Sequence, residues 1–231
     1  MPTATTTLFE HTTQQPLSKQ LREHTLAAHE DAETSDFMHR LLKGQLGRDA
    51  IAEYHAQMWF IYDALEHAVR TVADSPIGAN FADPRLERRM ALDSDLVSMA
   101  GRNWGEQVRV MPATAAYVER IEKMDVPGNE VRILAHHYVR YLGDVSGGQV
   151  IARMLQRHYG MGEQELSFYD FSALGKPKPY RDSYRSMLDS LVLTDSQRTE
   201  LLDEAVAAFQ CNFDLFAALS ARFPGEAPVE S

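Results

Sequence analysis

The stretch RYLGDVSGGQVIARM, residues 140–154, is the most informative part of the chain. It lies within residues 130–159, where apolar side chains recur every three or four positions, as on one buried face of a helix. Unbroken, that helix would be roughly 45 Å long. Gly143, Gly147 and Gly148 interrupt it, and each glycine costs about 1 kcal/mol relative to alanine. The pattern therefore predicts a long helix in which some other feature offsets roughly 3 kcal/mol.

Two interpretations account for these glycines. Small residues allow close packing between helices, and they also allow the backbone to approach a flat ligand and to bend there. Asp144 lies within the glycine cluster. A carboxylate beside a buried glycine face is costly unless it is hydrogen-bonded or hydrated, so Asp144 favours the ligand interpretation.

The helical pattern extends over most of the chain. Residues 51–69 and the segment after Thr194 show the same three-to-four spacing, whereas no run of alternating β-branched residues is flanked by hairpin turns. Candidate N-caps are Ser18, Ser35, Thr114, Asn129 and Thr194. We expect an all-α, single-domain protein: a flexible tail over 1–16, one domain over 17–221 and a polar tail over 222–231.

Composition narrows the functional classes. The 231 residues carry a formal net charge of −10, which argues against a general nucleic-acid binder. The single cysteine, Cys211, excludes an intramolecular disulfide, a cysteine-rich zinc site and a four-thiolate iron–sulfur cluster within one chain. The nine histidines are then the main candidates for metal binding. The absence of a secretory pattern and of a long apolar run predicts a cytoplasmic protein without a membrane anchor.

Two histidines near the start compete for a ligand role. A helix beginning near Leu17 places His29 on its apolar side, with Glu33 four residues later within reach of the imidazole. His24 lies close to the same face, so spacing does not choose between them, and either one fits an ordinary core or boundary histidine. No two histidines are four residues apart and no Glu-x-x-His occurs, which excludes a ferritin-like di-iron site.

Cys211 and the basic residues leave alternatives open. Cys211 lies in an apolar helical run, which is typical of a buried, inert thiol and gives no base for a nucleophile. The basic residues form three groups: Arg85, Arg88 and Arg89; Arg153 and Arg157; and Lys176, Lys178, Arg181 and Arg185. Each group fits a solvated face, a docking site for an acidic partner, or a clamp for carboxylates.

Three segments carry a resemblance to a known family: AAHEDAETSDFMHRLLKG (27–44), WFIYDALE (59–66) and HHYVRYLGDVSGGQVIARMLQRHYG (136–160). From about Ser18 to Ser220 the chain resembles the haem oxygenases, and most of all the soluble bacterial members that take iron from haem. The resemblance implies an all-α fold that holds haem between a proximal and a distal helix.

The resemblance also assigns site residues. His29, rather than His24, matches the axial ligand of the haem iron, and Glu33 matches the carboxylate that orients its imidazole. Gly143 and Gly147 match the distal glycines whose backbone lies against the haem, with Ser146 and Gly148 near them. The positions that match the distal water network are Tyr62, Arg140, Asp144 and Asn212. The positions that match contacts to the haem propionates are Arg22, Tyr138, Lys176 and Arg185. Arg22 departs from the usual lysine, which changes the geometry of that contact, and Pro177 and Pro179 depart from the pattern around Lys176.

The activity implied is cleavage of haem, which serves as both substrate and cofactor. Dioxygen and externally supplied electrons convert it to biliverdin, carbon monoxide and ferrous iron, while glycine backbone crowds the bound oxygen and Asp144 delivers protons through water. The sequence shows no flavin or iron–sulfur motif, so the donor is expected to be a separate ferredoxin or flavoprotein reductase that docks near Arg153 and Arg157. A monomer is expected.

Two other functions were weighed. A non-catalytic haem-storage protein would need His29 and the propionate contacts but neither Asp144 nor the distal glycines, so their joint presence favours the enzyme. A thiaminase-like hydrolase would need Cys211 as its nucleophile, and no matching motif surrounds Cys211.

Overall fold

The structure, a computed structural model, describes residues 15–224. Within this range it consists of helices and their connections, without a strand, so the expected all-α fold is confirmed. The helices are α1 (Leu17–His24), α2 (Leu26–Glu33), α3 (Asp36–Leu42), α4 (Arg48–Val72), α5 (Arg89–Ala100), α6 (Trp104–Gln107), α7 (Pro112–Glu122), α8 (Glu130–His137), α9 (Gly143–Tyr159), α10 (Pro177–Ser190) and α11 (Asp195–Arg222). Most of the two expected tails lies outside the described residues.

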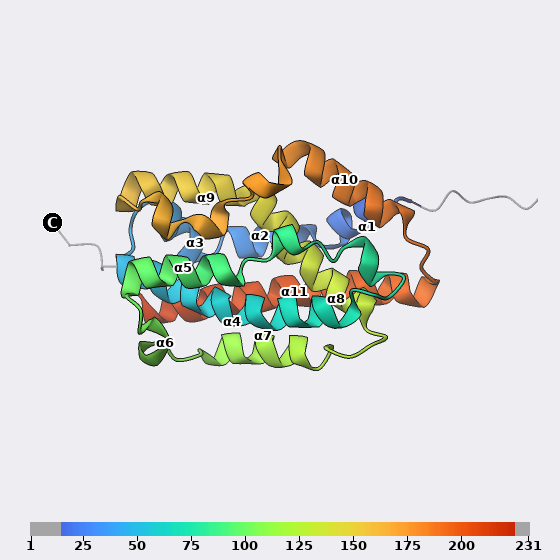
Figure 1. Ribbon diagram of the computed structural model, residues 1–231, viewed down its shortest axis with the longest axis horizontal. Coiled ribbons are helices and arrows are strands. Elements are labelled where there is room, and N and C mark those ends of the chain that lie inside the picture. The colour runs from blue at the N-terminus through green and yellow to red at the C-terminus, as the bar shows by residue number, and fades with distance from the viewer. Residues whose placement is uncertain (1–14, 225–231) are drawn as a thin grey trace, which may run out of the picture.

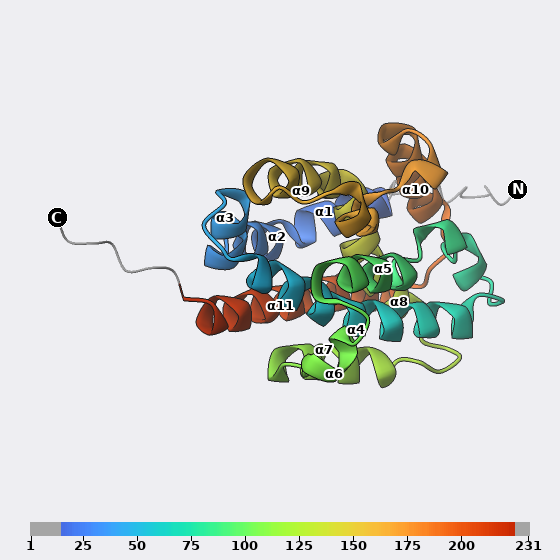
Figure 2. The same ribbon diagram turned by 60° about the vertical axis from the view of Figure 1, so that its left-hand side comes forward.

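The helices form layers around two long central helices, α4 and α11 (Figure 1). Helix α4 packs against α5, α7 and α8, and α11 packs against α2, α3, α7 and α8. In both ribbon views α2 runs between α9 on one side and α11 on the other (Figure 2). No helix within 15–224 combines the length and apolar character needed to cross a bilayer.

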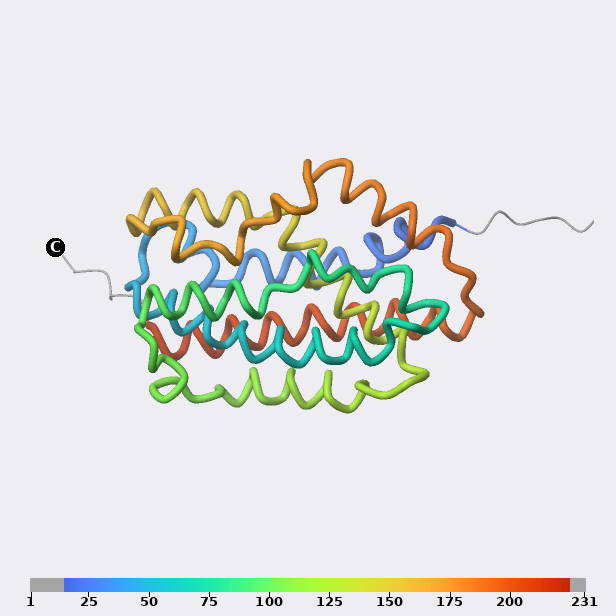
Figure 3. The backbone as a smooth tube through the Cα atoms, in the orientation of Figure 1, coloured from blue at the N-terminus to red at the C-terminus, as the bar shows by residue number. Residues whose placement is uncertain are grey.

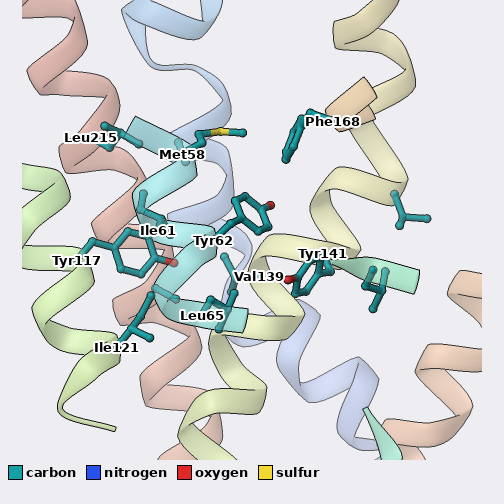
Figure 4. Packing of buried hydrophobic residues seen from close by; sticks show 14 of the residues in the cluster. Met58, Ile61, Tyr62, Leu65, Tyr117, Ile121, Val139, Tyr141, Phe168 and Leu215 are labelled. Atoms are coloured by element: carbon teal, nitrogen blue, oxygen red, sulfur yellow. The ribbon is translucent and has the colours of Figure 1, made fainter. Parts of the chain in front are cut away.

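The core forms where the sequence pattern places it. The expected apolar face of α4, from Ile51 through Met58 to Leu65, is fully buried. Tyr62 on α4 and Tyr117 on α7 are also fully buried within this cluster, as Figure 4 shows. Burying such large side chains is the main source of stability in a helical domain of this kind.

The long helix expected over residues 130–159 is interrupted. Between α8 and α9 the chain makes a π-helical turn over Tyr138–Leu142, and its path changes direction there (Figure 3). A π turn carries one extra residue and is found mostly at functional sites. The glycines follow this turn instead of breaking the helix themselves, since Gly143, Gly147 and Gly148 all lie within the regular helix α9.

Several expected helix boundaries are also corrected. The first helix ends at His24 and a second begins at Leu26, with Thr25 between them at φ −95° and ψ 0°. The Thr25 hydroxyl bonds back to the Leu21 carbonyl at 2.8 Å. Thr194 caps α11 as expected, with its hydroxyl accepting from the Gln197 amide. Ser35 and Asn129 occupy the cap positions of α3 and α8 without a side-chain cap bond. Ser18 and Thr114 were wrong as caps, since prolines already begin those helices or precede them: Pro16 caps α1 and Pro112 is the first residue of α7.

One buried carboxylate ties three helices together. Glu204 of α11 accepts from Arg120 of α7 at 2.6 and 3.0 Å, from Arg132 of α8 at 3.0 Å, and is bonded to His136 Nε2 at 2.9 Å. Burial opposes its charge, but the hydrogen bonds from His136 and Arg120 prevail and lower the pKa of Glu204 to about 2. The group therefore stabilises the fold in its ionised form.

The Glu204→Gln substitution tests this cluster. A carboxylate whose pKa is lower in the folded than in the unfolded state contributes stability fully above its ordinary pKa of 4.5, and loses it as the pH falls toward about 2. We expect the variant to lose about 2 kcal/mol of unfolding free energy at pH 7 and to show a flatter pH dependence between those values, measured by urea denaturation. Glu200→Gln, an exposed neighbour, is the control. An unchanged acid limb would contradict the assignment.

Candidate functional site

The proximal candidate His29 lies on α2 and faces α11. Its imidazole is 44% exposed, and its Nε2 lies 3.4 Å from Glu33 Oε1. The edge of Phe209 on α11 meets the ring, with centroids 5.3 Å apart and planes at 77°. Nε2 thus faces the Glu33 carboxylate, as expected from the sequence, and Nδ1 takes no part in that contact.

The alternative, His24, also faces α11. Its Nε2 lies 3.5 Å from Asp203 Oδ1, and its side chain is 45% exposed. Exposure therefore does not separate the two histidines. Their partners do, because His29 has both a carboxylate on its own helix and an aromatic wall from α11.

The distal candidates lie on the π turn and the first two turns of α9. A Cβ atom added at Gly143 or Gly147 would meet no atom within 4 Å, whereas at Gly148 it would lie 3.3 Å from the Tyr169 ring. Close helix packing does not explain Gly143 and Gly147, since no neighbouring helix touches them on that side. The observation supports the interpretation that this backbone approaches a flat ligand. Ser146 lies exposed between them.

Behind the glycines a charged side chain is buried in the core. Arg140 is only 6% exposed and donates to Asn212 Oδ1 at 2.7 Å. Its guanidinium also lies 3.2 Å from Met58 Sδ and 4.9 Å from the centre of the Tyr62 ring. Tyr62 donates a short hydrogen bond to Asp144 Oδ2. The structure therefore brings together all four residues expected to hold the distal water network.

This grouping changes the proton affinity of Asp144. Burial raises the pKa of the Asp144 carboxyl, although the charge of Arg140 and the hydrogen bond from Tyr62 oppose that rise. Burial also raises the pKa of Tyr62 well above its usual range, so its hydroxyl keeps its proton. Arg140 Nε is buried without a partner among the described residues, which leaves a donor for water. The arrangement can hold a proton at Asp144 and order water around it.

Helix α11 connects the proximal and distal groups. Phe209 touches His29 and Asn212 binds Arg140, and the two residues lie three apart on the same helix face. Phe209 carries only an apolar helical signal in the sequence, so its contact with His29 was not predicted. Its three-residue spacing from Asn212 was the available clue.

The expected propionate contacts are partly brought together. Tyr138 is the first residue of the π turn, and the Thr25 side chain at the α1–α2 break acts to lower its pKa. Burial raises the pKa of Tyr138, and the charges of Arg185 on α10 and Arg22 on α1 oppose that rise because both lie nearby. Lys176 is exposed and immediately precedes α10, which begins at Pro177. Thr25 was not expected from the sequence.

Comparisons with known proteins agree with this geometry. A family model described as heme oxygenase matches residues 15–218. The chain is 32% identical to heme oxygenase 1 of Synechocystis over 88% of this chain and 84% of that protein, and 35% identical to human heme oxygenase 1 over 89% and 72%. Among solved structures, Synechocystis heme oxygenase-1 in complex with heme superposes with a TM-score of 0.85 at 31% identity, covering 90% of this chain and 94% of that one. Heme oxygenase from Leptospira interrogans gives 0.83 at 31%, covering 88% and 99%.

The Gly147→Ala substitution tests the distal surface. Because the added methyl meets nothing in the ligand-free protein and alanine favours the helix, we expect the unfolding free energy to rise by about 1 kcal/mol. The same methyl would displace a flat ligand, so haemin affinity should fall about ten-fold, measured by absorbance titration. Gly105→Ala, at an equally open helical position on α6, should leave haemin affinity unchanged. Wild-type affinity in Gly147→Ala would contradict the assignment.

Proposed function

The chain belongs to the haem oxygenase family, and on this premise we propose how its own residues act in cleaving haem. It is a haem-degrading oxygenase, with haem as its ligand and substrate. Bound haem supplies the iron that binds dioxygen and the porphyrin carbon that is oxidised. The products we propose are biliverdin, carbon monoxide and ferrous iron.

On the proximal side His29 binds the haem iron. The Glu33 carboxylate, 3.4 Å from Nε2, limits the rotation of the imidazole, and the edge of Phe209 limits it from the other direction. The residues fit this role because the His29 ring is half exposed on α2 and already oriented by two neighbours.

On the distal side the backbone of Gly143 and Gly147 lies against the haem plane. Asp144 delivers protons through ordered water toward the bound oxygen, because burial raises the pKa of its carboxyl and so increases its affinity for a proton. Tyr62 holds the carboxyl in place by its hydrogen bond, and Asn212 holds Arg140 beside it. A carboxyl acting through water is a weaker acid catalyst than a histidine in direct contact. Slower proton delivery favours attack on the porphyrin edge over other reactions of the bound oxygen.

One observation favours a catalytic function over haem storage. Storage needs an iron ligand and carboxylate contacts, but not a buried guanidinium beside a protonatable carboxyl beneath open glycine backbone. Burying charged groups such as Arg140 and Asp144 costs stability, and a storage protein would gain nothing from that cost. The distal network therefore supports catalysis.

The propionate carboxylates bind at the edge formed by α1, the π turn and α10. Arg22, Tyr138 and Arg185 gather there, and Lys176 approaches from the start of α10. Arginine binds carboxylates in a two-pronged geometry, so Arg22 substitutes for the expected lysine with a different pose.

Electrons come from a separate donor, a ferredoxin or flavoprotein reductase. Arg153 and Arg157 are exposed on α9, beyond the distal glycines, and provide positive charge for an acidic donor. We further propose that the protein acts as a cytoplasmic monomer.

The assay that tests this function supplies haemin-loaded protein with ascorbate in air and follows the visible spectrum. Wild type should lose its haem band as biliverdin absorbance grows. Asp144→Ala should still bind haemin but form biliverdin at least about 100-fold more slowly, because proton delivery is lost.

Asp214→Ala, which removes an exposed carboxylate two residues beyond Asn212, is the matched control and should turn over like wild type. An unchanged haem band in the wild type would refute the cleavage reaction. A normal biliverdin rate in Asp144→Ala would refute the role of its carboxyl alone.

The iron ligand is tested by a pair of substitutions. His29→Ala should abolish the spectrum of imidazole-ligated iron in the haemin complex, whereas His24→Ala should preserve it. Electronic absorption and electron paramagnetic resonance measure the difference. Survival of that spectrum in His29→Ala, with loss in His24→Ala, would assign the ligand to His24.

A further inference from the structure

A buried histidine that the proposed mechanism does not use joins α8 to α10. His137, the last residue of α8, is 1% exposed, and its Nδ1 is hydrogen-bonded to the Tyr184 hydroxyl of α10 at 2.8 Å. The two rings are stacked with planes 3° apart and centroids 5.7 Å apart. Burial lowers the pKa of His137 to about 3, so this contact is a hydrogen bond between neutral groups at ordinary pH.

The residues that follow this pair in the two helices belong to the propionate edge. Tyr138 follows His137 and begins the π turn, and Arg185 follows Tyr184 on α10. The charge of Arg185 acts on Tyr138, as does that of Arg22. The contact between His137 and Tyr184 is thus one residue away, on both helices, from Tyr138 and Arg185, the pair of residues expected at the propionate edge.

Two other contacts hold α10 near its ends. Tyr180 donates to Asp83 at 3.2 Å, and Asp189 accepts from the Ser18 amide and hydroxyl at 2.8 and 3.0 Å. Asp83 and Asp189 are at least partly open to solvent, where hydrogen bonds exchange readily with water. The hydrogen bond between Tyr184 and His137 lies midway along α10, and both of its residues are buried.

Aromatic rings pack around the His137 imidazole. The ring centroids of Tyr141 and Phe81 lie 4.6 and 5.1 Å away, and the residue also borders a cavity of about 360 Å³ together with Val69 and Leu86. Within this packing the hydrogen bond to Tyr184 sets the orientation of the imidazole, because it is the only hydrogen bond that the ring makes among the described residues.

We propose that His137 is a positioning residue for the substrate: by holding Tyr184 it sets the register of α10, so that Arg185 stands beside Tyr138 and Arg22 as a clamp for the haem propionates. This inference rests on the proposed function. It concerns the affinity for the carboxylates of haem and not the rate at which bound haem is cleaved.

The test compares two ligands on the ligand-free protein. Haemin and its dimethyl ester differ only in whether the propionates are free carboxylates. Tyr184→Phe removes the hydroxyl and keeps the ring, so we expect the Kd for haemin to rise about five-fold in an absorbance titration, as expected for one lost hydrogen bond. The Kd for the dimethyl ester should stay at the wild-type value, and so should the rate of biliverdin formation per bound haemin.

Further variants test the same role of His137. His137→Leu should behave like Tyr184→Phe, and His137→Asn, whose amide reaches the position of Nδ1, should restore haemin affinity. Adding Tyr184→Phe to Arg185→Ala should weaken haemin binding no further than Arg185→Ala alone. Tyr159→Phe removes a hydroxyl that bonds the Leu41 carbonyl at 3.0 Å far from α10, and it should not change the preference between the ligands.

Equal weakening of both ligands by Tyr184→Phe would overturn the proposal, because it would show a general loss of structure. Unchanged haemin affinity would overturn it as well. The proposed function is tested separately. Wild-type protein that binds haemin without cleaving it would refute the cleavage reaction, whereas the comparison of the two ligands would still decide the role of His137.

Discussion

The buried guanidinium of Arg140 is the constraint on which the rest of the site depends. A charge in a helical core is stable only when polar groups surround it. Here those groups come from α4, through Tyr62 and Met58, and from α11, through Asn212. Both central helices must therefore converge on the π turn that carries Arg140, and this convergence places Asp144 within the same polar group.

The open glycine surface and the polar network are two sides of one segment. The π turn directs Arg140 into the core, and the next turns of α9 expose the backbone at Gly143 and Gly147. Helix α11 then connects this distal side to His29 through Phe209. Proximal ligand, distal network and substrate edge are accordingly held by the same few helices, and a shift of any one would alter the others.

Much of this could be predicted from the sequence. Three-to-four periodicity identified the helices, and the cost of Gly143 and Gly147 together with Asp144 pointed to a ligand surface. The resemblance to a family, not spacing, separated His29 from His24, and the structure gives both histidines similar exposure. What could not be predicted depends on contacts between distant segments. No residue type marks a π turn in the sequence, the break at Thr25 falls within a continuous helical pattern, and the bond between His137 and Tyr184 joins residues 47 positions apart.

A crystal structure of the haemin complex tests the central claim most directly, since that claim is spatial: α2 supplies the iron ligand and the polar group around Arg140 faces the opposite side of the haem. We expect a His29 nitrogen on the iron, the backbone of Gly143 and Gly147 against the other face, and Asp144 linked to the iron-bound ligand through water. Iron bound by His24, or a haem that lies away from the start of α9, would contradict the account.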